Sequence, residues 1–262
     1  MSAGAAQPAL HDSGEGPVLL MLHAFPLDAS QWDHQVAALS GEFRCLRPDM
    51  WGCGASPAPP ETKPTLDGYA ESLLSLLDER GVTSFAVIGS SMGGYTAFAL
   101  WRKASDRITA LIFAGTRSAA DTEQRRTERE EQAQHILADD DVDDVVDAML
   151  PRLITAASQR EAHIVDPLAG RIRQCTPAGV AFCLRAMAAR PDSTELLAAM
   201  DAPALVIVGG QDALIPPDDT RELAQHLPRA QLLELQQCGH LPNVEDAPAF
   251  NAAVAEFLTG LG

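Results

Sequence analysis

A short run of small residues carries the first sign of chemistry in this chain. Gly89, Ser91 and Gly93 are spaced as G-x-S-x-G, between an apolar run that starts at Phe85 and an amphipathic run that continues to Leu100. This pattern is typical of a nucleophile elbow, a strained strand-to-helix turn that projects a serine hydroxyl over a sheet edge. Glycines there let the strand and the helix pack closely. The sequence therefore predicts Ser91 as a nucleophile.

The helix that follows this serine also predicts a place for negative charge. Its first N–H groups have no partner within the helix, and the positive end of the helix dipole lies there. We expect the Met92 N–H to stabilise an oxyanion on a substrate bound to Ser91. Ser90 is the rival nucleophile, but a motif centred on it would put Ile88 where a small residue is needed.

Two later residues fit the base and the acid that a serine nucleophile needs. The base takes the hydroxyl proton, and a third group holds its tautomer. In elbow proteins the acid and then the histidine follow the serine, each after a later strand. Of seven histidines only His240 directly follows the last expected strand, and Asp212 follows the strand expected over 204–209. Asp121 is the alternative acid, but it stands far from the preceding strand.

A second oxyanion donor is expected in the turn after the first buried strand. This apolar strand spans 17–22 and ends in the turn from His23 to Pro26. Pro26 should hold the turn open and leave the Phe25 N–H free. We interpret His23 as structural and not as a proton carrier.

The remaining candidates concern the pocket and the cysteines. Trp32 and Trp51 are candidate apolar walls for a substrate, with Phe25 and Met92. No cofactor motif is present. The five cysteines are odd in number and have no metal-ligand spacing, so we expect no metal site and no disulfide, and mostly buried thiols; they are Cys45, Cys53, Cys175, Cys183 and Cys238.

The elements that must position these residues alternate between strand and helix. Strand patterns at 17–22, 43–47, 85–90 and 108–115 are separated by helical patterns, and the alternation resumes from residue 204. Such βαβ units predict an α/β fold with a mostly parallel sheet and helices on both faces. From 117 to 199 we find only helical patterns. We therefore predict a core of 1–116 and 200–262 that is interrupted by an inserted helical cap, 117–199.

Composition narrows the classes of partner. The chain has 262 residues and a formal net charge of −17, which would repel nucleic acids and anionic membranes. No segment approaches a membrane span, and the first 16 residues lack the basic and apolar regions of a signal peptide. We expect a cytoplasmic protein with a small-molecule substrate. The sequence does not indicate its oligomeric state.

Taken together, these motifs resemble those of the α/β-hydrolase superfamily along nearly the whole chain. The resemblance includes the turn from His23 to Pro26, the loop 49–56, the elbow, the Asp212 loop and His240. The stretches 184–193 and 238–245 also resemble 3-oxoadipate enol-lactonases and their esterase relatives. The chain departs from the enol-lactonases at 23–26 and at 50–54.

The resemblance has a consequence for charge, because enol-lactonases act on an anionic substrate. An acidic protein would repel such a substrate unless cap arginines faced the pocket. The candidates are Arg152, Arg173 and Arg185.

These observations predict a cofactor-free serine hydrolase that cleaves an ester or a lactone through an acyl-enzyme. Ser91 would be the nucleophile, His240 the base and Asp212 its orienting acid. Two alternatives stay open: a perhydrolase, haloperoxidase or lyase that uses the same residues, and a ligand-binding protein without turnover.

Overall fold

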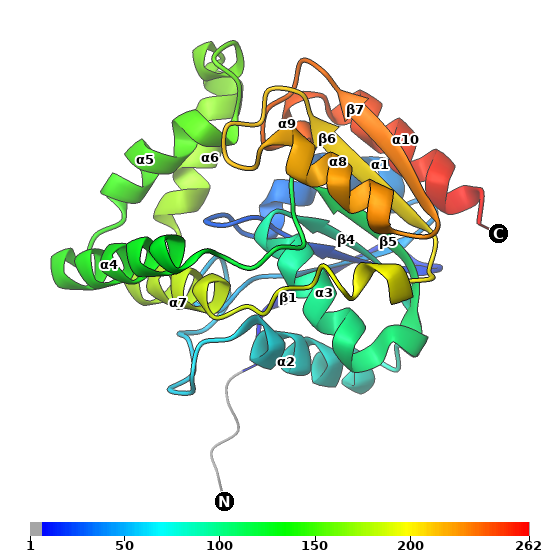
Figure 1. The fold of residues 1–262 in the computed structure, drawn as a ribbon, viewed down its shortest axis with the longest axis horizontal. Helices are drawn as coiled ribbons and strands as arrows, with labels where there is room; N and C mark the ends of the chain where they lie inside the picture. The colour runs from blue at the N-terminus through cyan, green and yellow to red at the C-terminus, as the bar shows by residue number, and fades with distance from the viewer. Residues whose placement is uncertain (1–6, 262) are drawn as a thin grey trace, which may run out of the picture.

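The computed structural model describes residues 7–261, and a seven-stranded sheet forms its centre (Figure 1). The strand order is β1-β3-β2-β4-β5-β6-β7. All neighbouring strands pair in parallel except β1, which is antiparallel to β3. The strands are β1 (Leu10–Ser13), β2 (Val18–Leu22), β3 (Arg44–Pro48), β4 (Phe85–Ser90), β5 (Ile108–Ala114), β6 (Ala204–Gly209) and β7 (Ala230–Leu235). The mostly parallel sheet that the sequence predicted is confirmed.

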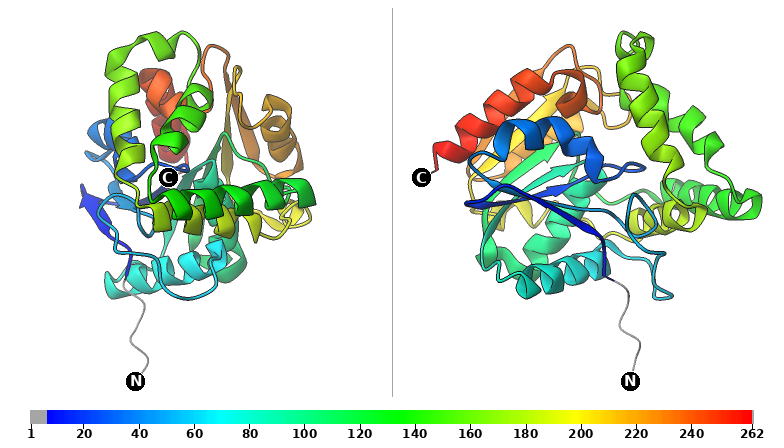
Figure 2. Two further views of the ribbon diagram at one scale, coloured as in Figure 1. Left: turned by 90° about the vertical axis from the view of Figure 1, so that its left-hand side faces the viewer. Right: turned by 180° about the vertical axis from the view of Figure 1, so that it is seen from behind.

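Helices cover both faces of this sheet (Figure 2). The α-helices of the core are α1 (Asp33–Leu39), α2 (Leu66–Glu79), α3 (Met92–Ala104), α8 (Pro217–His226), α9 (Pro242–Glu245) and α10 (Ala247–Thr259). Short 3-10 helices are η1 (Ala29–Trp32), η2 (Ser105–Arg107), η3 (Ser158–Arg160) and η4 (Leu197–Ala199). One buried cluster joins the sheet to α2, α3 and α8, and a second joins it to α1 and α10. This two-sided burial explains why the central strands read as continuous apolar runs.

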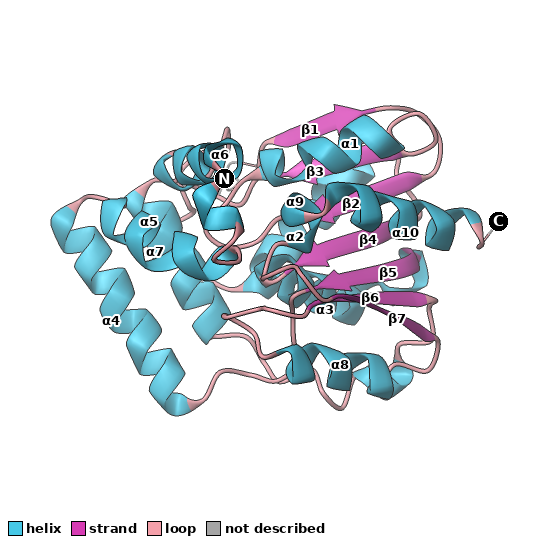
Figure 3. Ribbon diagram, turned by 90° about the horizontal axis from the view of Figure 1, so that it is seen from above, coloured by secondary structure: helices cyan, strands magenta, loops and turns pink. Residues whose placement is uncertain are grey.

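The chain between β5 and β6 contains four further α-helices and no strand. They are α4 (Glu123–Asp139), α5 (Asp143–Leu153), α6 (Ala162–Arg173) and α7 (Pro177–Ala188). We call residues 117–199 the helical segment. Figure 3 shows its helices beyond the end of the sheet toward which the parallel strands point. Open parallel sheets place their binding and active sites at that end, where the strands have their carboxyl termini.

The N-terminal strand β1 was not expected from the sequence, in which the first strand pattern begins at residue 17. Leu10 to Ser13 pair with Pro48 to Cys45 along the edge of the sheet. The Arg44 side chain also donates hydrogen bonds to Asp12. A four-residue edge strand with little apolar alternation gives no local signal, because its partner strand lies more than 30 residues away. Among the described helices, none has the length and apolar character needed to cross a membrane.

Candidate active site

Ser91 occupies the turn between β4 and α3 in a conformation that non-glycine residues rarely adopt. Its φ is 52° and its ψ is −111°, outside the allowed regions for L-residues. Two hydrogen bonds hold this backbone: the Ser91 N–H donates to the Ala114 carbonyl at 2.9 Å, and the Thr116 hydroxyl donates to the Ser91 carbonyl at 2.9 Å. The end of β5 therefore fixes the elbow. Backbone strain of this kind is concentrated at functional sites.

The glycines of the elbow are required by close backbone packing. A Cβ on Gly89 would lie 2.5 Å from the carbonyl carbon of Gly93, and a Cβ on Gly93 would collide with the carbonyl oxygen of Leu22. Ser90, the rival nucleophile, is fully buried at the end of β4, whereas Ser91 lines a cavity.

Asp212 and His240 lie together as a buried pair at the ends of β6 and β7. The Nδ1 atom of His240 lies 2.7 Å from Oδ2 of Asp212, and both side chains are at most 2% exposed. The other carboxylate oxygen of Asp212 accepts hydrogen bonds from the backbone N–H groups of Leu214 and Ile215 at 2.8 and 2.9 Å. Because the carboxylate is fixed in this way, it selects the His240 tautomer that carries the proton on Nδ1. The other ring nitrogen, Nε2, is buried and has no hydrogen-bond partner among residues 7–261.

The pair and the elbow meet at the end of β5. A Cβ on Gly115 would lie 3.1 Å from Nδ1 of His240 and 3.3 Å from Oδ2 of Asp212. Gly115 directly follows Ala114, which holds the Ser91 N–H. The end of β5 therefore contacts both the Ser91 backbone and the Asp212–His240 pair, while no hydrogen bond joins the Ser91 hydroxyl to Nε2 of His240.

Glu245 anchors the loop that carries His240. One of its carboxylate oxygens accepts a hydrogen bond from the Gly239 N–H, and the other accepts from the Thr155 N–H and the Ser158 hydroxyl. The carboxylate thus ties the histidine loop to the helical segment. Sequence reasoning missed this role, because nothing local distinguishes Glu245 from a surface acid.

Two backbone N–H groups near the serine are free to hold an oxyanion. Neither the Phe25 N–H nor the Met92 N–H donates a hydrogen bond to any described residue. The turn that carries Phe25 is fixed by His23, whose Nδ1 donates to the Ala24 carbonyl at 2.9 Å and whose Nε2 accepts from the Met50 N–H at 2.9 Å. Both nitrogens of His23 are thus engaged, and its structural role is confirmed.

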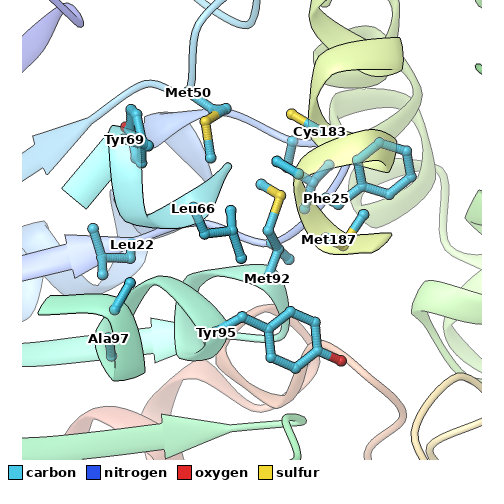
Figure 4. Packing of buried hydrophobic residues seen from close by; sticks show 14 of the residues in the cluster. Leu22, Phe25, Met50, Leu66, Tyr69, Met92, Tyr95, Ala97, Cys183 and Met187 are labelled. Atoms are coloured by element: carbon cyan, nitrogen blue, oxygen red, sulfur yellow. The ribbon is translucent and has the colours of Figure 1, made fainter. Parts of the chain in front are cut away.

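A cavity of about 260 Å³ opens beside Ser91. Its apolar wall includes Phe25 from the core together with Leu184 and Met187 from α7. Figure 4 labels Phe25, Met92 and Met187 among the buried side chains where α3 and α7 meet. Apolar walls with few polar groups are typical of small-molecule sites.

The polar part of the cavity lining is rich in arginine. Four arginines and one carboxylate contribute to it: Arg117, Arg125, Arg129, Arg152 and Asp144. Of the three cap arginines considered from the sequence, Arg152 lines the cavity, and no described residue forms an ion pair with it. Arg173 and Arg185 instead form ion pairs with Asp143 and Glu130.

Asp121, the alternative acid of the sequence analysis, organises three of the arginines of the helical segment. Its fully buried carboxylate forms ion pairs with Arg129 at 2.6 Å, Arg190 at 2.9 Å and Arg117 at 3.3 Å. Burial alone would raise the pKa of Asp121, but Arg190 and Arg129 outweigh it and lower the pKa to about 2. Asp121 is therefore a structural anion and has no contact with His240.

The two candidate tryptophans lie in packed core instead of on the cavity. Trp32 is fully buried against Phe250 between the sheet and α10, and Trp51 packs edge-on against Tyr69 and Phe182. A large aromatic residue gives the same sequence signal in a core as in a pocket wall, so the pattern could not separate them.

The cysteines correct one expectation. Cys53 and Cys175 form a disulfide between the loop after β3 and the start of α7, across 122 residues of sequence. The prediction that all five are reduced is therefore wrong. The other three are buried as predicted, and burial raises the thiol pKa of Cys45 to about 11 and of Cys183 and Cys238 to about 12.

The described residues contain one group that could hold a metal ion, and it lies outside the elbow. It comprises His135, Asp139 and Asp144 on α4 and α5, all exposed. Exposed carboxylates beside a histidine also pair with it without a metal, as His135 does here with both acids at 3.3 and 3.4 Å.

Comparison with known proteins extends these observations. A family model described as the alpha/beta hydrolase fold matches residues 17–247. The 3-oxoadipate enol-lactonase 2 of Acinetobacter baylyi is 26% identical over 239 residues, covering 91% of this chain and 87% of that protein. A thermophilic esterase from Thermogutta terrifontis, solved with malate bound, superposes with a TM-score of 0.93 at 33% identity and covers 100% of this chain and 96% of its own. The enol-lactonase from Burkholderia xenovorans gives a TM-score of 0.88 at 31% identity, with 98% of each chain covered.

Proposed function

This chain belongs to the alpha/beta hydrolase fold family and is a hydrolase, and we propose that it cleaves a carboxylic ester or a lactone through an acyl-enzyme on Ser91. His240 is the general base and then the general acid, and Asp212 orients it. The observation that carries this proposal is the buried Asp212–His240 hydrogen bond of 2.7 Å, which leaves Nε2 of His240 as a free acceptor.

The first half of the reaction transfers the acyl group to the serine. As the Ser91 oxygen attacks the substrate carbonyl, its proton moves to Nε2 of His240 and an Oγ–C bond forms. The imidazolium then protonates the leaving alkoxide as the ester C–O bond breaks. In a lactone the released hydroxyl stays attached to the acyl group. Asp212 stabilises the imidazolium without taking its proton.

Water completes the cycle. His240 removes a proton from a water molecule, the hydroxide oxygen attacks the acyl carbon, and His240 returns the proton to Ser91 as the acid leaves. In both halves the free N–H groups of Phe25 and Met92 donate to the oxyanion. Losing one such donor in serine hydrolases costs about 10²–10³ in kcat.

The helical segment serves as a cap over this chemistry in the same proposal. Its helices α4, α5 and α7 supply most of the residues that line the cavity beside Ser91. A cap of this kind excludes water and selects the substrate, while the sheet edge supplies the reacting groups.

A panel of p-nitrophenyl esters and lactones tests the proposal. The wild-type protein should hydrolyse members of the panel, and Ser91→Ala should lower kcat by about 10⁶-fold. Ser90→Ala is the matched control, since it removes a neighbouring buried hydroxyl, and it should keep kcat within about threefold. Equal losses in the two variants, or activity that survives in Ser91→Ala, would refute the assignment.

The same panel separates hydrolysis from the alternative chemistries. Halogenation that requires peroxide and exceeds ester hydrolysis would indicate a perhydrolase. Tight binding of panel members without product would indicate a ligand-binding protein.

A further inference from the structure

The hydroxyl group of Tyr95 belongs to the wall of the cavity beside Ser91. Tyr95 stands on α3 one helical turn after Ser91, and both residues line the same cavity. The residue is only 4% exposed, yet its hydroxyl makes no hydrogen bond to any residue within 7–261. Figure 4 shows this hydroxyl pointing away from the packed hydrophobic side chains. Unlike the buried Ser90 hydroxyl, the Tyr95 oxygen is accessible from the cavity, so a ligand there can hydrogen-bond to it.

The tyrosine ring is held in one orientation. The guanidinium of Arg190 lies 4.0 Å from its centroid, within the range of a cation–π interaction. Arg190 is itself fixed, because it donates to the carbonyls of Met187 and Ala119 and forms an ion pair with Asp121. The free hydroxyl is therefore preorganised toward the cavity, and little conformational entropy is lost when a ligand binds it.

Positive charge surrounds this hydroxyl. Three guanidinium groups, from Arg117, Arg129 and Arg190, form ion pairs with the carboxylates of Asp121 and Asp219, and Arg190 also lies close enough to Asp192 to help lower the pKa of that carboxyl. The cavity lining as a whole still has an excess of positive charge, with four arginines against the single carboxylate of Asp144, in a chain with a formal net charge of −17.

The tyrosine oxygen lies close enough to two of these arginines to influence them. Burial alone would lower the pKa of Arg117, but Tyr95, Asp219 and Asp121 together raise it. Burial lowers the pKa of Arg129, and Asp121 and Tyr95 offset part of that effect. Both arginines line the cavity with Tyr95. A neutral ligand would leave the excess charge uncompensated, whereas an anion would neutralise it.

We propose that Tyr95 determines the specificity of this cavity: its hydroxyl donates a hydrogen bond to a carboxylate on the acyl group of the substrate, beside the guanidinium groups of Arg117 and Arg129. The assignment of the acyl group rests on the proposed hydrolase function, in which that group is held on Ser91. The Cα atoms of Ser91 and Tyr95 are about 6 Å apart along the helix axis. Because both side chains line one cavity, an acyl group held on Ser91 can extend toward the Tyr95 hydroxyl within it.

Tyr95→Phe tests the proposal, since it removes only the hydroxyl and keeps the ring under Arg190. For p-nitrophenyl esters whose acyl chain ends in a carboxylate, we expect kcat/KM to fall about 10- to 100-fold. Esters of equal chain length that end in a methyl group should change less than about twofold. An equal loss for both ester classes, or no loss for either, would overturn the proposal.

Tyr69→Phe is the matched control. The Tyr69 hydroxyl donates to the Asp49 carbonyl and does not line the cavity. Its removal should affect both ester classes alike. Thermal unfolding of both variants reports whether they keep the fold.

A binding measurement separates failure of this proposal from failure of the hydrolase assignment. In a Ser91→Ala background, titration calorimetry compares monomethyl glutarate, which carries one carboxylate, with uncharged dimethyl glutarate. Adding Tyr95→Phe should weaken binding of the monoester about 10- to 100-fold and leave the diester unchanged. Equal effects on the two ligands would refute the role of Tyr95 even if Ser91 proved to be the nucleophile. Persistent turnover in Ser91→Ala would refute the nucleophile alone.

Discussion

The carboxyl ends of the parallel strands and the helical segment position their residues in different ways. At the carboxyl ends of the strands, Ser91 directly follows β4, and Asp212 and His240 lie in the short loops that follow β6 and β7, so the register of the sheet limits where their backbones can lie. In the helical segment, side chains from three helices form the cavity wall, and their positions depend on packing and on the buried ion pairs of Asp121. The comparison indicates that the reacting groups depend on backbone geometry, whereas substrate choice depends on side chains that can change independently.

The largest expected effect is a loss of kcat when Asp212 is replaced. Asp212→Asn can still accept from the N–H groups of Leu214 and Ile215, but its NH₂ would face Nδ1 of His240. The histidine would then carry its proton on Nε2 and could not act as a base. We expect kcat to fall about 10⁴-fold with little loss of stability, measured by steady-state kinetics and urea unfolding.

Asp218→Asn is the matched control for that substitution. The side chain of this aspartate is 90% exposed, forms an ion pair with Arg221 and lies outside the cavity lining. It should keep kcat within about twofold. A loss of less than tenfold in Asp212→Asn would contradict the proposed role of Asp212.

The next largest effect concerns the helical segment, and it should appear in stability more than in chemistry. Asp121→Asn leaves the buried Arg129 and Arg190 without their carboxylate. We expect the free energy of unfolding to fall by about 3–5 kcal/mol, measured in urea, while fluorophosphonate still labels Ser91.

Arg185→Gln provides the comparison within the same segment. It removes a partly exposed ion pair with Glu130, and such pairs contribute about 1 kcal/mol or less. If Asp121→Asn destabilised the protein no more than Arg185→Gln, the buried cluster would not organise the segment. If it abolished labelling of Ser91, the two regions would not be separable.

The smallest expected effect is the change with acidic pH in the difference in unfolding free energy between the wild-type protein and Asp121→Asn. The pKa of Asp121 is lowered from an ordinary 3.8 to about 2. A lowered pKa stabilises the folded state above the ordinary value, and this contribution is lost as the pH falls from about 4 to about 2. The stability difference between wild type and Asp121→Asn should therefore shrink across this range, as followed by urea unfolding at each pH. A difference that stayed constant would contradict the lowered pKa.

Many of the residues at the carboxyl ends of the strands could be predicted, because the sequence patterns that indicate them are local. The strand expected over 204–209 coincides with β6, and the strand expected before His240 is β7; Asp212 and His240 lie in the loops that follow them. The order serine, acid, histidine then follows from the topology of the sheet. The structure brings Asp212 and His240 into hydrogen-bond contact where the sequence predicted it.

The other features depend on contacts between distant parts of the chain. Cys53 and Cys175 are 122 residues apart and share no motif, so only the fold reveals their disulfide. Likewise, Tyr95 lies inside the elbow stretch, but its cavity-facing hydroxyl follows from Arg190, almost a hundred residues later. In the helical segment, a charged residue can face solvent, a buried carboxylate or the cavity, and periodicity does not decide among the three.

The most direct test of the central claim is to identify the residue that becomes covalently modified. The protein is treated with a fluorophosphonate probe, digested and analysed by peptide mass spectrometry, with Ser91→Ala treated in parallel. The account predicts a single adduct on Ser91 in the wild-type protein and none in Ser91→Ala. An adduct on Ser90 or on any other residue, or labelling that persists in Ser91→Ala, would contradict it.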